Sequence, residues 1–403
     1  MVNAYNFKID LQCPQCGAPA ELDETETIIQ CGFCRTSNII HTHPFPCFFI
    51  TPKQEKLSHL PVVYIPYWRF KGLEFALGPK RPAFRAIDQS YIAVDRPGLP
   101  RSLGFRSQTQ RLQFIQKGIK GGFLPPSLSR RDILNQIAGG NKGKVHIGEI
   151  LSLIFMPFLH DDHRVYDGLT GKATGMNSAD LGIEKKAPSY RLSFTPSQCP
   201  SCGWDLAGET DSLVLHCKKC TSFWLIHEKK LNRVNTEFFG LTPKTDIFMP
   251  FWRFDLEFDH LNLSTMADLI RVANIPRVVQ EEHQTRKLYF YTPAFKLNPK
   301  LFLRIAKQIT VAQIDAKEAP RLTDALFHPA DLPIDEGFQA MLPVLMEICA
   351  NKKEAWDMLN REKIRIRSFG LVYLGFYTQG SEYIQDELGF SVLVNSLKFG
   401  RKL

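Results

Sequence analysis

Eight of the ten cysteines form two sets with the same spacing, C-x2-C-x14-C-x2-C. The sets comprise Cys13, Cys16, Cys31, Cys34, Cys199, Cys202, Cys217 and Cys220. Zinc prefers four tetrahedral ligands, and four thiolates satisfy it without any other group. Each set therefore predicts a zinc ribbon, in which two C-x2-C turns hold one structural zinc ion in a closed site. Gly17 and Gly203 follow the first turns, and glycine tolerates the positive φ that such a turn needs.

Disulfides and an iron–sulfur cluster are the alternatives to two structural Zn²⁺ ions. Disulfides are rare in a cytosolic chain, and a redox-active C-x-x-C motif would not explain two paired sets at one spacing. Cys47 and Cys349 stand alone. We interpret both as small buried apolar residues rather than nucleophiles.

Two histidine clusters could supply further metal ligands. One spans residues 41–43, and its first member, His41, recurs as His227 after the second cysteine set. We interpret it as the polar end of the last strand of the ribbon. The other cluster, at residues 160–163, lacks ligand spacing on one helix face, and we interpret residues 160–164 as a hairpin turn followed by a strand that ends in a second turn.

A Trp-Arg pair also recurs, as Trp68-Arg69 and Trp252-Arg253. Each arginine could stack on an aromatic ring or bind the glutamate that follows it in the repeat. These glutamates are Glu74 and Glu257. We interpret the pairs as structural. No nucleotide-binding, zinc-protease or serine-hydrolase motif occurs, so that the sequence does not predict an enzyme.

The formal net charge of +9 is unevenly distributed. Residues 95–144 contain ten basic side chains, opposed only by Asp95 and Asp132. The ten are Arg96, Arg101, Arg106, Arg111, Lys117, Lys120, Arg130, Arg131, Lys142 and Lys144. This segment could bind a nucleic-acid backbone, an anionic membrane surface or an acidic protein. The alternative is an exposed face whose acidic complement lies elsewhere in the fold.

The two cysteine sets themselves count against nucleic acid, because the residues between their cysteines are acidic. The first set has four acidic residues and no basic one, and the second has three acidic residues against two lysines. They are Glu21, Asp23, Glu24 and Glu26, and then Asp205, Glu209 and Asp211 against Lys218 and Lys219. Such a charge repels phosphate.

The composition is that of a globular protein, with 44% hydrophobic and 23% charged residues over 403 positions. This balance excludes a disordered chain, a coiled coil and a collagen-like fibre. No apolar run approaches the roughly 18–20 residues of a membrane-spanning helix, and the first residues do not resemble a signal peptide. We therefore expect no transmembrane segment and a cytoplasmic location.

The similarity of the two cysteine sets extends along the chain and predicts an internal duplication. An offset of 186 residues carries Cys13 onto Cys199, and an offset of 184 carries residues 65–70 onto 249–254. We expect four domains. They are zinc ribbon 1 at residues 1–45, an α+β domain at 46–188, zinc ribbon 2 at 189–232 and a second α+β domain at 233–403.

The predicted fold class is α+β, with two rubredoxin-like zinc ribbons, each followed by a mainly antiparallel α+β domain. Short apolar and aromatic runs predict strands at residues 62–70, 150–160, 246–254, 288–295 and 369–378. Each of the first four contains a proline, which predicts edge strands or bulges. Helices are predicted from Ser129 to Gly139, from Asn298 to Ile309 and from Phe338 to Lys363.

The chain resembles a loose group of bacterial proteins in which a zinc ribbon precedes a P-x-W strand and a β unit ending in G-x-T-G-K-x-x-G. The matching segments here are Cys13–Cys34, Pro66–Trp68 and Gly168–Gly175, and Pro250–Trp252 repeats the second. The resemblance implies that the ribbon cysteines bind zinc. Some members of the group carry a transmembrane segment and resemble accessories of membrane-stress or flotillin-like systems.

We therefore expect a non-enzymatic, zinc-stabilised scaffold or adaptor that binds a protein partner and could be accessory to a membrane-associated system. The alternative function is nucleic-acid binding through residues 95–144. A third hypothesis, an enzyme with an unrecognised site between the halves, also stays open.

Overall fold

The structure is a computed structural model that describes residues 7–43, 45–104, 110–116, 118–129, 132–133, 143–182, 190–227, 230–318, 322 and 325–400. These residues form a mixed α and β fold with two compact units. Unit 1 comprises the described residues of 1–72, 87–141 and 148–197. Unit 2 comprises those of 73–86, 142–147 and 198–403. Each unit is discontinuous in sequence.

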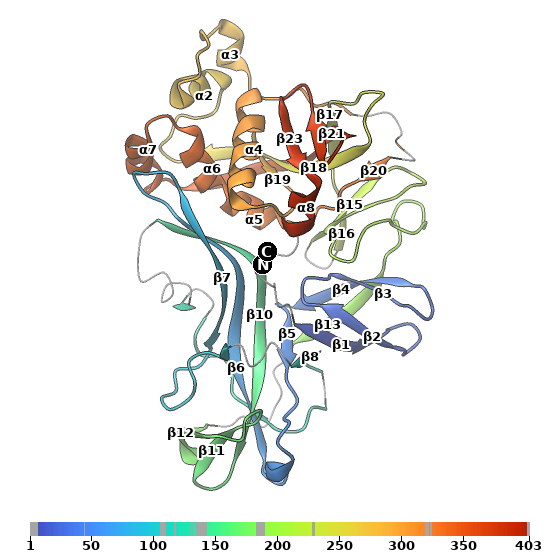
Figure 1. The fold of residues 1–403 in the computed structure, drawn as a ribbon, viewed down its shortest axis with the longest axis vertical. Helices are drawn as coiled ribbons and strands as arrows, with labels where there is room; N and C mark the ends of the chain where they lie inside the picture. Colours follow the sequence, from blue (N-terminus) through green and yellow to red (C-terminus); the bar gives the residue numbers. More distant parts are fainter. Residues whose placement is uncertain are drawn as a thin grey trace. The chain divides into compact units, whose positions relative to one another are not determined.

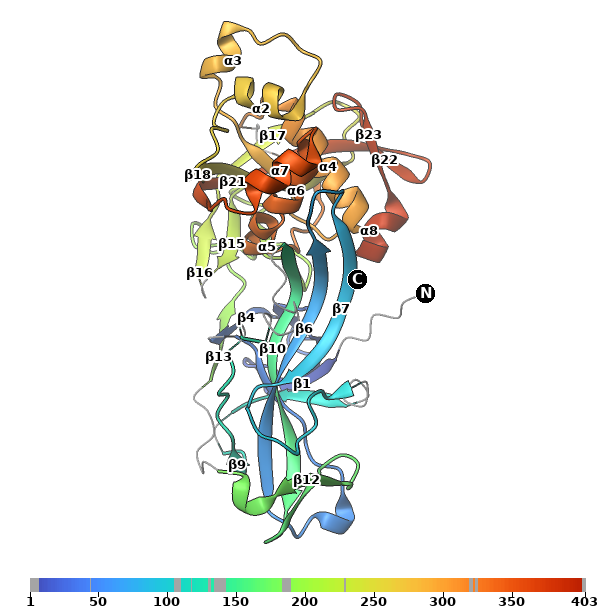
Figure 2. The same ribbon diagram turned by 90° about the vertical axis from the view of Figure 1, so that its left-hand side faces the viewer.

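Most strands of unit 1 belong to one ten-stranded sheet (Figures 1 and 2). The strands are β1 Lys8–Gln12, β2 Pro19–Asp23, β5 Cys47–Phe49, β6 Val62–Ala76, β7 Ala83–Ile92, β8 Arg111–Phe114, β9 Gly122–Phe123, β10 Lys144–His160, β11 Arg164–Asp167 and β12 Ala173–Asn177. The order is β12-β11-β10-β5-β8-β1-β2, and β6 pairs with β10, β7 and β9. The ends of β6, β7 and β10 also contribute residues to unit 2.

The predicted turn between β10 and β11 is confirmed. The two strands pair antiparallel, and Asp161 in the turn accepts hydrogen bonds from the N–H groups of His163 at 2.8 Å and Arg164 at 2.7 Å. These bonds, with one from the Tyr166 hydroxyl, lower the pKa of Asp161 to about 2. The second turn is also present, because β11 pairs with β12. The 160–163 cluster is therefore a turn.

Strand β6 is buried on both faces, as its alternating side chains show. Ile65 and Tyr67 lie in one hydrophobic cluster with Phe158, whereas Tyr64 and Trp68 lie in a second cluster. Successive side chains of a strand point to opposite faces, so that two layers of unit 1 are anchored on this one strand.

Each cysteine set is followed by a strand of a small three-stranded sheet. The first sheet has the order β13-β4-β3, with β3 Ile28–Gln30, β4 Ser37–His43 and β13 Arg191–Pro196. The second has the order β14-β15-β16, with β14 Val214–His216, β15 Phe223–His227 and β16 Lys230–Arg233. All pairs in both sheets are antiparallel. Strand β13 thus belongs to unit 1, although the second cysteine set begins only three residues after it.

Unit 2 is built on a seven-stranded sheet. Its strands are β17 Thr236–Phe239, β18 Ile247–Phe258, β19 Phe290–Pro293, β20 Leu326–Phe327, β21 Ile364–Gln379, β22 Glu382–Gln385 and β23 Phe390–Leu393. The main order is β19-β18-β21-β22-β23, all antiparallel, while β17 joins β21 and β20 joins β18 as parallel neighbours. The five strands predicted from sequence are confirmed here and in unit 1; four of them are longer than predicted, and β19 is shorter.

The prolines do not all lie where predicted. Pro293 is on the edge strand β19, as expected, but Pro250 lies in β18, which has neighbours on both sides. The edge-or-bulge prediction is wrong for Pro250. On one side of β18, the partner changes from β20 at Phe248 to β19 at Phe251, and Pro250 lies between these positions. The missing N–H therefore falls at a gap between two partner strands.

The helices of unit 2 are α2 Met266–Ala273, α3 Glu281–Thr285, α4 Pro299–Ala312, α5 Ile334–Gln339, α6 Met341–Ile348, α7 Lys352–Leu359 and α8 Val394–Gly400. The predicted start of α4 is confirmed, because Asn298 caps it and Pro299 opens it. A single helix over residues 338–363 is wrong. The chain leaves the helix at Cys349, and Asn351 caps a new one by accepting a bond from the N–H of Glu354.

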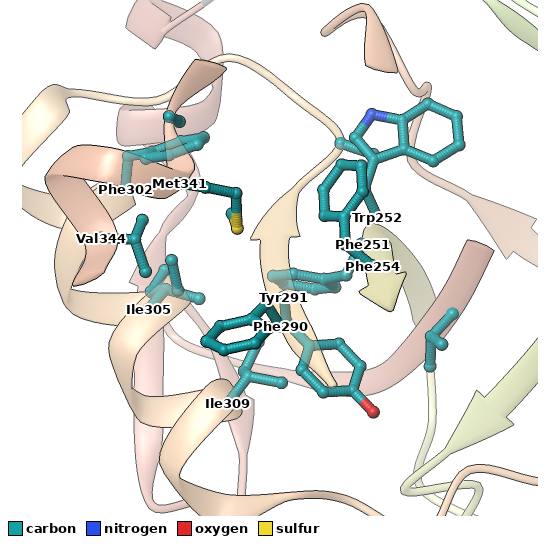
Figure 3. Close-up of a cluster of buried hydrophobic side chains, with 14 of the residues drawn as sticks. Phe251, Trp252, Phe254, Phe290, Tyr291, Phe302, Ile305, Ile309, Met341 and Val344 are labelled. Carbon is teal, nitrogen blue, oxygen red and sulfur yellow. The ribbon is translucent and has the colours of Figure 1, made fainter. Parts of the chain in front are cut away.

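The core of unit 2 lies between the sheet and these helices (Figure 3). Ile305 and Ile309 of α4 and Val344 of α6 belong to the same cluster as the aromatic residues of β18 and β19 and face them. Phe251, Phe290 and these three aliphatic side chains are all at most 1% exposed. None of the helices built from described residues is long and apolar enough to cross a membrane. Of the helix predicted from Ser129, only the capping bonds between Ser129 and Asp132 and residues 132–133 lie in the described part.

Candidate metal centres

All four C-x2-C turns have the same backbone geometry. In each turn the N–H of the first cysteine donates to the carbonyl five residues later, at 2.7–3.0 Å. Its carbonyl accepts from the N–H four residues later, at 2.8–2.9 Å. These two bonds curl the turn so that both of its sulfurs face one point.

Each turn ends in a residue with left-handed backbone. Gly17 and Gly203 have φ of 73° and 72°, as the sequence predicts. Arg35 and Thr221 take the same role in the second turns, with φ of 60° and 55°. A β-branched residue such as Thr221 rarely adopts this conformation, so that the turn imposes strain there. Sequence analysis missed these two positions because neither residue type indicates a positive φ.

The sulfurs of each set gather around one point. All four ligand atoms of a set lie within 4.8 Å of one another. Cys13 and Cys34 have sulfurs 3.7 Å apart, and the sulfurs of Cys202 and Cys217 are 3.5 Å apart. A tetrahedral ion with metal–sulfur bonds of about 2.3 Å separates its sulfurs by roughly 3.8 Å. A disulfide needs about 2.05 Å, and all ten cysteines, each in the described part of the chain, are free. The disulfide alternative is therefore wrong.

The clusters sit at the surface with their inner halves buried. The first and third cysteines of each set are buried, whereas the second and fourth are partly or fully exposed. Four protein sulfurs complete a tetrahedron, which leaves no position for a water or a substrate. This arrangement suits a structural ion rather than a catalytic one.

A hydroxyl group lies against the last cysteine of each set. Thr36 Oγ1 is 3.0 Å from Cys34 Sγ, and Ser222 Oγ is 3.0 Å from Cys220 Sγ. The Thr36 hydroxyl is the main cause that lowers the pKa of Cys34 to about 6. The indole Nε1 of Trp224 donates to Ser222 Oγ at 2.8 Å, which leaves the Ser222 hydrogen free for sulfur. Sequence analysis missed both hydroxyls, although the 186-residue offset relates them.

Within the described part of the chain, no other candidate ligand joins the clusters. Among the described residues, only the two cysteine sets bring three or more His, Cys, Asp or Glu ligand atoms together. His41 Nε2 instead lies 3.1 Å from Thr195 Oγ1 on the neighbouring strand β13. Cys47 and Cys349 are 3% and 6% exposed, and burial raises the pKa of both thiols. They are buried apolar residues, as predicted.

The repeated tryptophans have equivalent roles. The indole Nε1 of Trp68 donates to the Leu128 carbonyl at 2.9 Å, and that of Trp252 donates to the Leu332 carbonyl at 2.9 Å. Both tryptophans are at most 4% exposed. Each therefore fixes a distant loop to its strand, which supports the structural interpretation of the pairs.

The repeated arginines bind acidic residues, but not the predicted ones. Arg69 pairs with Glu24 at 3.2 Å and with Asp88, and lies 5.2 Å from the Phe7 ring. Arg253 binds both carboxylate oxygens of Glu237, at 2.5 and 2.6 Å. The Arg253 guanidinium also lies 4.8 Å from the ring of Tyr289. The stacking interpretation is confirmed.

The prediction that Glu74 or Glu257 binds these arginines is wrong. Glu74 pairs with Arg85 at 2.7 Å, while Glu257 faces Arg365 and Arg367 at 3.8 and 3.9 Å. The bases nearest to the two glutamates come from neighbouring strands, Arg85 from β7 and Arg365 and Arg367 from β21. The spacing of each glutamate from its arginine in the sequence does not reveal these partners.

Half of the ten basic residues of the segment 95–144 lie in the described part of the chain. These are Arg96, Arg101, Arg111, Lys120 and Lys144, whereas Arg106, Lys117, Arg130, Arg131 and Lys142 lie outside it. Arg111 pairs with Asp10 at 2.8 Å and with Glu21, because β8 runs beside β1. Lys144 lies 3.4 Å from Glu74. For these two bases, the acidic complement lies elsewhere in the fold.

Comparison of the chain with protein-family models, curated proteins and solved structures gives no significant match. The two clusters of four cysteines suggest an internal duplication. The function therefore has to be inferred from the clusters and the surfaces around them.

The hydroxyl of Ser222 should strengthen metal binding by the second cluster. We expect Ser222→Ala to weaken metal retention by about 10–100-fold, because it removes a hydrogen bond to a ligand sulfur. Competition with a chromophoric chelator measures this change. Ser201→Ala is the matched control, since Ser201 is exposed in the first turn of the same cluster. Equal metal retention in both variants would contradict the role of Ser222.

The buried pair of Arg69 and Glu24 should couple strongly. Their side chains are 3% and 0% exposed. We expect Arg69→Met to destabilise unit 1 by about 3–5 kcal/mol in urea denaturation, because a buried carboxylate loses its partner. Adding Glu24→Gln should recover most of this loss. Arg85→Met removes a half-exposed arginine and should cost about 1 kcal/mol or less.

The stability of the Arg69→Met variant should also depend on pH. Burial raises the pKa of Glu24, and Arg69 opposes that effect. Without Arg69 the pKa of the folded state lies further above the unfolded value of about 4.3. The folded state then binds the extra proton, so the stability of Arg69→Met falls as the pH rises above that value. A loss that is the same at pH 5 and pH 8 would contradict a buried, unpaired Glu24.

Proposed function

We propose that both cysteine clusters bind Zn²⁺ in rubredoxin-like ribbons and that the protein is a non-enzymatic scaffold or adaptor for a protein partner. The observation that carries this proposal is the closure of both sites by four sulfurs each. Zinc suits this donor set because thiolates in a tetrahedron are its preferred structural ligands. A closed site has no position for a reacting water, so that the metal stabilises a surface rather than supplying chemistry.

The small size of each ribbon supports a structural role for the ion. The sheet that accompanies each cluster has three strands, and all three are only three to five residues long in the second ribbon. The free energy of metal binding adds to the stability of such short strands, because it is free energy of folding there. Two ribbons of one design present two related surfaces on one chain.

Nucleic-acid binding through residues 95–144 is the alternative function. It is less well supported, because Arg111 and Lys144 pair with carboxylates and Arg111 neutralises acidic residues of the first ribbon. Contact with an anionic membrane would need the same exposed charge and is weakened by the same pairs.

Metal analysis tests the ligand assignment. The purified chain should contain two zinc ions, and Cys16→Ser and Cys202→Ser should each contain one. Removal of one ligand destabilises its own ribbon, because the free energy of metal binding is free energy of folding there. Cys47→Ser, a change at a lone buried cysteine, is the control and should keep both ions. Two ions in Cys202→Ser, or iron in the place of zinc, would contradict the assignment.

Capture of partners from native lysate tests the scaffold function. We expect the full chain to recover a defined protein that remains bound after nuclease treatment and is identified by mass spectrometry. Loss of every partner after nuclease treatment would instead support the nucleic-acid alternative. Turnover of a small substrate by the pure protein would contradict a non-enzymatic role.

A further inference from the structure

Each ribbon exposes one large apolar side chain beside its cysteine cluster. Phe33, between the third and fourth cysteines of the first set, is 72% exposed. Trp204, two residues after the second cysteine of the second set, is 55% exposed. Among the described residues 7–43 and 198–227, these are the only large hydrophobic side chains that are exposed.

The two aromatic residues mark the same corner of the ribbon. The 186-residue offset places Lys219 at the position of Phe33. The Lys219 ammonium lies 5.1 Å from the centre of the Trp204 ring, so these two positions are neighbours across the cluster. The first ribbon thus supplies its aromatic from one turn and the second from the opposite turn.

An aromatic ring with half or more of its surface in water contributes little to the ribbon's own stability. Aromatic side chains are enriched at the centres of protein interfaces, where they bury a large area with little loss of conformational freedom. The Trp204 carbonyl accepts a hydrogen bond from the N–H of Cys199 at 2.7 Å, and Asp205 pairs with Gln198, so that the backbone holds the ring ready for a partner.

The charges around Trp204 indicate what kind of partner fits. Lys219 lies beside the ring and Lys218 precedes it, both exposed, but residues 198–227 carry three acidic side chains against these two lysines. Zinc with four thiolates adds a formal charge of −2. A polyanion such as nucleic acid is repelled by this sum, whereas a single carboxylate can pair with the two lysines.

We propose that Trp204, Lys218 and Lys219 form a docking site, the aromatic corner, for an extended protein segment with an apolar side chain beside one carboxylate. The apolar side chain packs on the indole ring, and the carboxylate pairs with the lysines. This inference rests on the proposed scaffold function and names the surface that performs it. Phe33 has no lysine pair between its cysteines, so the corner of the first ribbon accepts an apolar side chain without a carboxylate.

Random dodecapeptides displayed on phage test the aromatic corner on the full-length protein. Enriched peptides should combine an aliphatic or aromatic residue with a neighbouring Asp or Glu. Trp204→Ser should weaken binding of such a synthetic peptide by about tenfold or more, as expected for a central anchor. Lys218→Glu with Lys219→Glu should weaken it as well. Val278→Ser is the matched control, because Val278 is 83% exposed outside the ribbons, and its affinity should stay unchanged.

Three outcomes overturn the proposal, provided that every variant retains two metal ions. They are equal peptide affinity in the wild type and Trp204→Ser, displacement of the peptide by a 20-residue oligothymidine, and a change in oligomeric state as the sole effect of Trp204→Ser.

The capture experiment separates this proposal from the scaffold function. A partner that binds the wild type and Trp204→Ser equally overturns the aromatic corner and leaves the scaffold function in place. Failure of the wild type to capture any protein overturns the scaffold function, while peptide binding that depends on Trp204 would still support the corner.

Discussion

The convergence of four cysteine sulfurs in each ribbon is the constraint on which the local structure depends. Four thiolates at separations of about 3.5–3.7 Å between paired sulfurs repel one another unless a cation lies among them. The turns that bring them together impose left-handed backbone on Arg35 and Thr221, which such residues avoid on their own. We attribute the stability of these turns to the metal that we propose, since its binding free energy offsets both the repulsion between the thiolates and the backbone strain.

The two units use the same devices with different residues. The Trp-Arg pair of each unit ties its strand to a distant carbonyl and to an acidic partner, and an aromatic ring lies over each guanidinium. In unit 1 the acid is Glu24 of the ribbon itself, whereas in unit 2 it is Glu237, which follows the ribbon. The Trp-Arg pairs thus keep their role while their acidic partners differ. An ancient duplication would leave this pattern, in agreement with the two cysteine clusters.

The two cysteine clusters could be predicted from the sequence because their spacing is local, and so could the start of α4 at Asn298 and Pro299. The partners of Arg69 could not, because Asp88 reaches it across the β6–β7 pair, whose register the sequence does not define, and Glu24 precedes it by 45 residues. The pairing of β13 with β4 is equally non-local. The break before α7 had a local signal in the sequence, because Asn351 is a good N-cap residue. The apolar run of α6 that precedes it favoured one continuous helix instead. The aromatic corner could not be predicted, because Trp204 follows one C-x2-C turn of the second cluster and Lys219 belongs to the other. Only the structure shows that these two residues lie side by side.

X-ray absorption at the zinc edge of the purified full-length protein tests the central claim most directly. We expect two zinc ions per chain, each with four sulfur neighbours at about 2.3 Å and no nitrogen or oxygen neighbour. An oxygen or nitrogen in the first shell would mean an open or mixed site and would contradict a closed structural ion. A signal from iron in place of zinc would contradict the assignment of the metal.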